Sequence, residues 1–264
     1  MKLGFIGTGV ITEAIVTGLL ASDYPARAFI LSQRSADISK RLALADDRVS
    51  VVTDNQQIVD DADIVFLAVR PQVAEAVIRP LRFQRGQQVA SLIATVTAET
   101  LQDWIDNPVA ITRAIPLPAV ANQRGVTAIF PAQDQLEALF DALGSVVCAE
   151  TLNEFDAYAA ASSLMGLYFG VMETAAGWLQ MQGTSKGNTQ TYLAKIFLEL
   201  AHTAEVAGDK GFGDLRQEHS TPNGLNQQMF EVFAQNGGVS ALETALESVA
   251  LRVRAAHSQN IPKQ

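Results

Sequence analysis

The first 150 residues alternate short apolar runs with amphipathic stretches. Apolar runs such as 2–6, 28–32 and 62–69 have the continuity expected of strands that are covered on both faces. Between such runs, segments such as 36–45 and 98–105 place apolar residues at helical spacing. This alternation predicts an α/β fold with a doubly wound parallel sheet over residues 1–150.

The pattern changes after residue 150. Residues 153–183 predict one long helix rich in alanine and other small residues, and further helical stretches follow without a convincing strand. The first helix is apolar on most of its faces, which favours burial against a second copy of the chain. The alternative is a single-chain bundle. We therefore expect an all-α dimerisation and substrate domain over residues 151–264.

Composition and charge narrow the range of partners. The formal net charge is −9 without any cluster of lysine and arginine, which argues against nucleic acid and against an anionic membrane surface. Cys148 is the only cysteine, so no disulfide can form within the chain, and a cytoplasmic location is favoured. The three histidines are scattered, and no metal site is expected.

The opening segment 3–15 is apolar enough to suggest a secretion signal, but Glu13 and the order strand, turn, helix favour a folded start. Gly7 permits a tight turn, and Gly9 lets the backbone approach a pyrophosphate at the positive end of the following helix. The third small position of the dinucleotide fingerprint is Thr12. A structural turn without a ligand is the alternative. The candidate pyrophosphate contacts are Gly7, Thr8, Gly9, Val10 and Ile11.

The end of the second strand bears on the choice between NAD and NADP. Residues 32–35 contain no acid that would accept a hydrogen bond from a free 2′-hydroxyl. Arg34 can pair with a 2′-phosphate, and Ser32 and Ser35 supply hydroxyl donors, so NADP(H) is favoured over NAD. The alternative is an exposed arginine in a polar loop. The end of the fourth strand adds four candidate cofactor contacts, Ala68, Val69, Arg70 and Pro71.

Five sequence segments are best considered together, because they occur in order along nearly the whole chain. They are GFIGTGVITEAIVTGLL (4–20), DADIVFLAVRPQ (61–72), ITRAIPLPAVANQRGVTAIF (111–130), STPNGLNQQ (220–228) and GGVSALETALESVALR (237–252). In these segments the chain resembles the pyrroline-5-carboxylate reductase family. The resemblance implies a Rossmann-type N-terminal domain and a helical dimerisation domain. It also implies hydride transfer from NAD(P)H to the C=N carbon of a cyclic imine carboxylate, which gives proline.

The chain departs from that family in the segment that corresponds to the family's substrate loop. The family's Thr-Ser-Pro-Gly-Gly-Thr-Thr is replaced by residues 220–226, so two threonine hydroxyls are missing. Thr221 and Asn226 can still bind a carboxylate or carbonyl, and His219 can donate a proton. These three are the candidate catalytic residues. The alternative for His219 is that it caps the end of a helix.

Three functional hypotheses follow. The leading one is an NADPH-dependent reductase of a cyclic imine carboxylate, such as pyrroline-5-carboxylate, or of a related imine or keto acid. A β-hydroxyacid dehydrogenase would share the two-domain plan but depends on a lysine in the helical half. Lys186 and Lys195 are the interior candidates, and neither has a convincing surrounding motif. The third hypothesis is an NADPH-binding protein without turnover, which the altered substrate loop keeps open.

Overall fold

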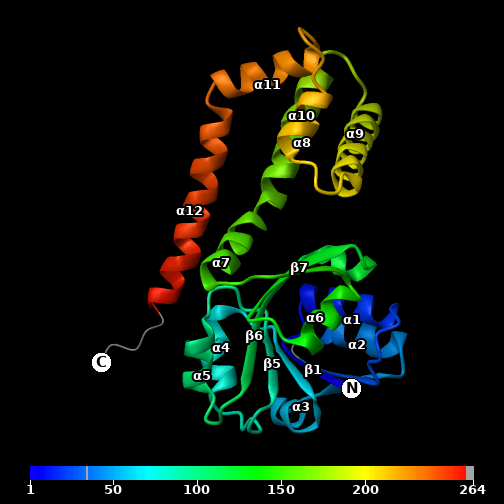
Figure 1. Ribbon diagram of the computed structural model, residues 1–264. Helices are drawn as coiled ribbons and strands as arrows, with labels where there is room; N and C mark the ends of the chain where they lie inside the picture. The colour runs from blue at the N-terminus through cyan, green and yellow to red at the C-terminus, as the bar shows by residue number, and fades with distance from the viewer. Residues whose placement is uncertain (34, 260–264) are drawn as a thin grey trace. The chain divides into compact units, whose positions relative to one another are not determined.

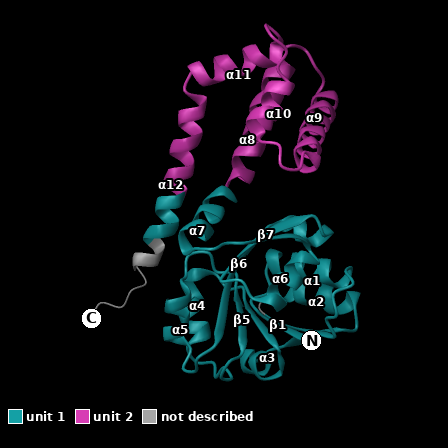
Figure 2. Ribbon diagram, in the orientation of Figure 1, with its two compact units in different colours: residues 1–162, 250–264 teal, residues 163–249 magenta. Residues whose placement is uncertain are grey.

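The computed structural model describes residues 1–33 and 35–259, with side chains to residue 255. Contacts divide the chain into two compact units, shown in different colours in Figure 2. The first unit comprises residues 1–162 and the C-terminal residues from 250 onward, and the second comprises residues 163–249. The first unit holds the sheet (Figure 1), whereas residues 163–249 contain helices and no strand.

The sheet of the first unit has eight strands in the order β3-β2-β1-β4-β5-β6-β7-β8. Neighbouring strands are parallel, except that β7 runs antiparallel to β6. The predicted doubly wound α/β sheet is confirmed, with the correction that it is mostly parallel. β6 and β7 are joined only by the short 3-10 helix η1 (Pro118–Asn122), whereas a parallel neighbour needs a crossover of a dozen or more residues. The strands are β1 (Lys2–Ile6), β2 (Ala28–Ser32), β3 (Val49–Val52), β4 (Ile64–Leu67), β5 (Gln88–Ser91), β6 (Ala110–Pro116), β7 (Gly125–Phe130) and β8 (Gly144–Cys148).

Helices cover both faces of the sheet and bury two apolar clusters (Figure 1). One cluster joins the strands to α1, α2 and α6, with Ile15, Leu42 and Leu139 as examples. The other joins the opposite face to α3, α4 and α5, with Ile58 and Ile78 as examples. The helices are α1 (Val10–Leu20), α2 (Ala36–Ala45), α3 (Asn55–Asp61), α4 (Pro71–Ile78), α5 (Ala98–Trp104), α6 (Asp134–Asp141) and α7 (Leu152–Ala161).

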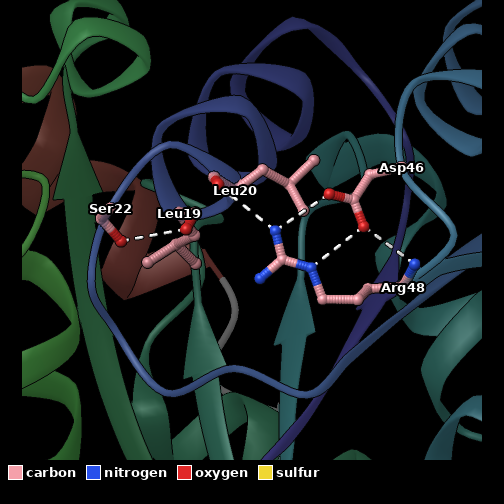
Figure 3. Close-up of polar contacts among 5 residues, drawn as sticks. All are labelled: Leu19, Leu20, Ser22, Asp46 and Arg48. Atoms are coloured by element: carbon pink, nitrogen blue, oxygen red, sulfur yellow. Dashed lines mark hydrogen bonds and ion pairs between the residues drawn. The ribbon is translucent and has the colours of Figure 1, made fainter.

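Polar side chains close the carboxyl end of α1, as Figure 3 shows. The Ser22 hydroxyl donates to the Leu19 carbonyl at 2.9 Å, and Nη2 of Arg48 donates to the Leu20 carbonyl at 3.3 Å. Arg48 also pairs with Asp46 at 2.9 Å. Hydrogen bonds from the Arg48 side chain and backbone lower the pKa of Asp46 to about 2. A cation at this end of α1 complements the helix dipole.

The long helix predicted over 153–183 is divided in the structure. α7 ends at Ala161, and α8 (Leu164–Met181) begins a new helix in the second unit. The Ser162 hydroxyl donates to the Ala159 carbonyl at 2.7 Å, a local bond that competes with helix continuation. The remaining helices are α9 (Lys186–Val206), α10 (Phe212–Glu218), α11 (Leu225–Gln235) and α12 (Gly238–Gln259). Within residues 1–33 and 35–259, no helix has the length and hydropathy needed to cross a bilayer.

Candidate functional site

The glycine turn after β1 leaves the mouth of α1 open. Gly7 has φ +105°, and a Cβ placed there would lie 2.4 Å from the Ala68 carbonyl oxygen. A Cβ on Gly9 would have no heavy atom within 4 Å. Gly9 is the N-cap of α1, and it brings no side chain to cap the first N–H groups of the helix. These N–H groups and the positive end of the dipole therefore form a ready site for an anion.

Three buried hydroxyl groups fix this turn, two of them to β2 and one to α1. Thr8 donates from Oγ1 to the Ser32 carbonyl at 2.6 Å, and the backbone N–H of Gly7 donates to Ser32 Oγ at 2.9 Å. Thr12 donates from Oγ1 to the Gly7 carbonyl at 2.7 Å. This bond gives a physical reason for the threonine at the third position of the fingerprint. Ser32 thus supports the turn directly, and its contact with a 2′-phosphate stays a prediction.

A hollow of about 360 Å³ adjoins the turn. It is formed where β1 to β4 end at one edge of the sheet, and it includes Thr53 and Asn55, which the sequence analysis missed. The Asp54 side chain accepts from the Gln56 N–H at 2.9 Å and caps α3, so that Asn55 begins the helix. The detectable signal was a polar Thr-Asp-Asn sequence directly after the third strand. The lining residues are Ile6, Gly7, Ser32, Gln33, Ala36, Thr53, Asn55, Val69 and Val77.

The start of α2 borders the same hollow. Arg34, the predicted partner of a 2′-phosphate, lies outside the described residues. Ser35 is the N-cap of α2, and its hydroxyl makes no capping bond to that helix. Ala36, the first residue of α2, lines the hollow. The N-terminus of a second helix therefore borders the hollow.

The predicted contacts at the end of β4 lie beside the glycine turn. The Ala68 N–H donates to the Ile6 carbonyl at 2.9 Å, and its carbonyl oxygen lies against Gly7. Val69 is buried and lines the hollow, while Arg70 and Pro71 are exposed at the start of α4. At the mouth of α1, Val10 is exposed and Ile11 packs partly against the core.

In the second unit, the three candidate catalytic residues lie in or beside the loop between α10 and α11. His219 ends α10, and its Nδ1 lies 2.8 Å from the Leu215 carbonyl. The side-chain amide of Asn226 donates to the His219 carbonyl at 2.6 Å. Thr221 is exposed, and its carbonyl accepts from the Gly224 N–H at 2.8 Å. Lys186 and Lys195, the lysines of the dehydrogenase hypothesis, are both exposed on α9.

Comparisons with known proteins agree with this architecture. The sequence model of a family described as NADP oxidoreductase, coenzyme F420-dependent, matches residues 2–97. A pyrroline-5-carboxylate reductase from Pseudomonas aeruginosa is 27% identical over 266 residues, covering 95% of both chains. The structure of a pyrroline-5-carboxylate reductase from Coxiella burnetii has a TM-score of 0.85 at 25% identity, covering 97% of this chain and 98% of that one. The NADP-bound pyrroline carboxylate reductase from Plasmodium falciparum has the same fold, with a TM-score of 0.82 at 15% identity and the same coverage.

Proposed function

We propose that this chain, which the matches support as a member of the pyrroline-5-carboxylate reductase family, reduces a cyclic imine carboxylate such as pyrroline-5-carboxylate to proline with NADPH. The observation that carries the proposal is the open mouth of α1 behind Gly7 and Gly9, next to a hollow, in a chain matched end to end by such reductases. A bound nicotinamide coenzyme would supply the hydride.

The main task of the protein is to hold the imine substrate and the coenzyme and to orient them toward each other. A protonated imine is already an electrophile, so the site must fix its carbon against the coenzyme and exclude water. The first turn of α1 would bind the pyrophosphate, and residues 68–71 would border the next section of the coenzyme. In the second unit, Thr221 and Asn226 would orient the substrate carboxylate beside the N-terminus of α11.

His219 is the proposed proton donor. Its Nδ1 lies within hydrogen-bonding distance of a backbone carbonyl, which assigns the Nδ1–H tautomer to the neutral ring. Nε2 is then the ring nitrogen that would carry the donated proton. The same bond also caps α10, so the capping role that the sequence left open is compatible with proton donation.

Preference for NADPH over NADH is part of the proposal. It is supported by the absence of an acid between residues 32 and 35 and by the hydroxyl of Ser35, which is not used to cap α2. We expect Arg34→Ala to abolish the preference for NADPH, measured as the ratio of the two dissociation constants. An unchanged ratio would refute the assignment of Arg34.

We also propose that the chain works as a homodimer or higher homo-oligomer in the cytoplasm. None of the residues of α8, α10 and α11 is buried within one chain. Large apolar side chains such as Phe169, Trp178 and Met181 are exposed on α8. Exposed apolar surface on this scale is typical of an interface, and a second copy is the partner that the resemblance implies. The cytoplasmic assignment rests on the single cysteine.

The deciding experiment is an NADPH oxidation assay with the full chain and pyrroline-5-carboxylate, followed by detection of proline. We expect both coenzyme oxidation and proline formation. NADPH binding without oxidation over a panel of cyclic imines and keto acids would instead support a binding protein. Oxidation of β-hydroxyacids that is lost in Lys195→Ala would support the dehydrogenase.

A further inference from the structure

Arg113 is a charged side chain almost fully buried in the first unit, at 2% exposure. It lies on β6, in register with Ser91, the last residue of β5, and therefore at the carboxyl edge of the sheet. Its Nη2 donates to the Ala94 carbonyl at 2.8 Å. Ala94 is exposed on the segment that joins β5 to α5. The hydrogen bond from the buried Arg113 side chain therefore connects this segment to β6 of the sheet.

The other partners of Arg113 come from α7. Its Nη1 lies 3.7 Å from Oδ1 of Asp156, which is also buried. Its guanidinium carbon lies 4.7 Å from the centre of the Phe155 ring. Burial lowers the pKa of Arg113, while the carboxylates of Asp156 and Glu99 oppose this shift. The guanidinium stays charged, because arginine is not deprotonated in proteins.

A gain in stability alone is a weak explanation for the buried pair of Arg113 and Asp156. Removing two charges from water costs free energy that their attraction often fails to recover, so a buried ion pair is often no more stabilising than apolar residues of similar volume. A guanidinium nevertheless fixes direction well, because its planar fork donates to several acceptors at set angles. Here the fork connects the loop after β5 with the first turns of α7.

The position of that loop relates it to the coenzyme. In open α/β sheets, dinucleotides lie across the carboxyl ends of the strands. The hollow is lined from the ends of β1 to β4, and β5 lies next to β4 on the side away from β1. With strands about 4.8 Å apart, the end of β5 is about 10 Å from β1, within reach of the second half of a dinucleotide.

We propose that Arg113, held by Asp156 and Phe155, is a positioning residue that sets the loop around Ala94 at the nicotinamide end of the coenzyme site. The inference rests on the proposed reductase function for its kinetic consequences. Arg113 makes no contact with the substrate in this proposal. The planar shape of its guanidinium, and not its positive charge alone, should be needed to position the loop.

The test uses Arg113→Lys, which keeps the charge but loses the fork, and Asp156→Asn, which keeps the shape but loses the charge. We expect each to lower kcat for the imine about 10- to 100-fold, as a small misplacement of reacting groups does. The dissociation constant of NADPH should stay close to that of the parent, because the α1 mouth is intact. The deuterium isotope effect on kcat should rise, and the fluorescence of bound nicotinamide should change.

Gln87→Met is the matched control. Gln87 is buried before β5, at the opposite edge of the sheet, and its side-chain amide donates to the Val59 and Ala62 carbonyls at 2.7 and 3.1 Å. Its loss should lower the unfolding temperature without altering the isotope effect or the nicotinamide fluorescence.

Four outcomes would overturn or separate the two proposals. Folded Arg113→Lys with an unchanged isotope effect and unchanged fluorescence would overturn the positioning role. Failure of both variants to fold would assign the pair to stability, with the same consequence. A parent chain that binds NADPH but reduces no imine would end the reductase proposal, while fluorescence would still decide the role of Arg113. A parent that does not bind NADPH would end both.

Discussion

At the scale of single residues, two glycines of the same turn are required for different reasons. Gly7 is required by the backbone, because its φ is positive and a Cβ would strike the Ala68 carbonyl. Gly9 has φ −104°, which any residue can adopt, and its missing side chain faces open space. Neither the backbone nor the packing therefore requires glycine at position 9, which indicates that the space in front of it is kept for a ligand.

We predict that Gly9→Ala folds like the parent but binds NADPH at least about tenfold more weakly, or about 1.4 kcal/mol. The added methyl group would keep the backbone from approaching the pyrophosphate. NADPH titration and thermal unfolding measure the two effects separately. The control is Gly86→Ala, where φ is +76° and no atom lies near, so that stability falls by about 1–2 kcal/mol and affinity does not change. Parent-like affinity in Gly9→Ala would contradict a pyrophosphate at this turn.

At the scale of elements, α1 is supported at its carboxyl end by charge. The folded-state pKa of Asp46 is about 2 against an ordinary value of 3.8, so its contribution to stability is complete above pH 3.8 and is lost as the pH falls toward 2. We predict that Asp46→Asn is less stable than the parent near neutral pH and that this difference shrinks in acid. Denaturant unfolding, down to the lowest pH at which the parent is folded, measures it. A difference that is constant with pH would show that the Arg48 pairing does not stabilise the fold.

The loop before α11 yields a second prediction at this scale. Asn226→Ala removes the amide that bonds to the His219 carbonyl and the proposed contact with the substrate carboxylate. We expect KM for pyrroline-5-carboxylate to rise about tenfold, as the loss of one charge-assisted hydrogen bond of about 1.5 kcal/mol implies, with NADPH affinity unchanged. Steady-state kinetics over both substrates measure this.

Asn236→Ala is the control for that variant. Asn236 makes the same kind of bond at the other end of α11, where its side-chain amide donates to the Val232 carbonyl at 2.8 Å. If both variants change KM equally, the effect comes from the stability of α11 and not from a substrate contact.

Much of the element order could be predicted from the sequence, because strands buried on both faces leave continuous apolar runs. The helices α3 and α10 were missed, since their largely polar sequences show too few apolar residues at helical spacing. The break between α7 and α8, where the Ser162 hydroxyl donates to the Ala159 carbonyl, left no apolar pattern. The candidate site, too, could be predicted only in part. Gly7 and Gly9 follow a known fingerprint, whereas Asn55 and Arg113 gain their roles from neighbours that are distant in sequence.

At the scale of the whole molecule, the two units differ in whether they need a second chain to bury their apolar residues. The sheet unit buries its own apolar clusters, and the coenzyme contacts that we propose, Arg34 aside, lie within its described residues. The helical unit leaves α8 without a buried residue, with Phe169 at 66% exposure. Coenzyme binding should thus need one chain, and a stable helical unit should need two.

We therefore predict that the parent chain has a mass in solution of twice 28.3 kDa or a higher multiple. Phe169→Arg should shift the mass toward a single chain, because an interface of the size typical of homodimers, above about 2,000 Å², tolerates a buried unpaired charge poorly. It should also lose imine reduction while it keeps NADPH binding. Leu44→Arg, at a site 78% exposed on α2, should change neither mass nor activity. Light scattering coupled to gel filtration measures the masses, and a parent that stays at 28.3 kDa at high concentration would leave the apolar face of α8 without its proposed partner.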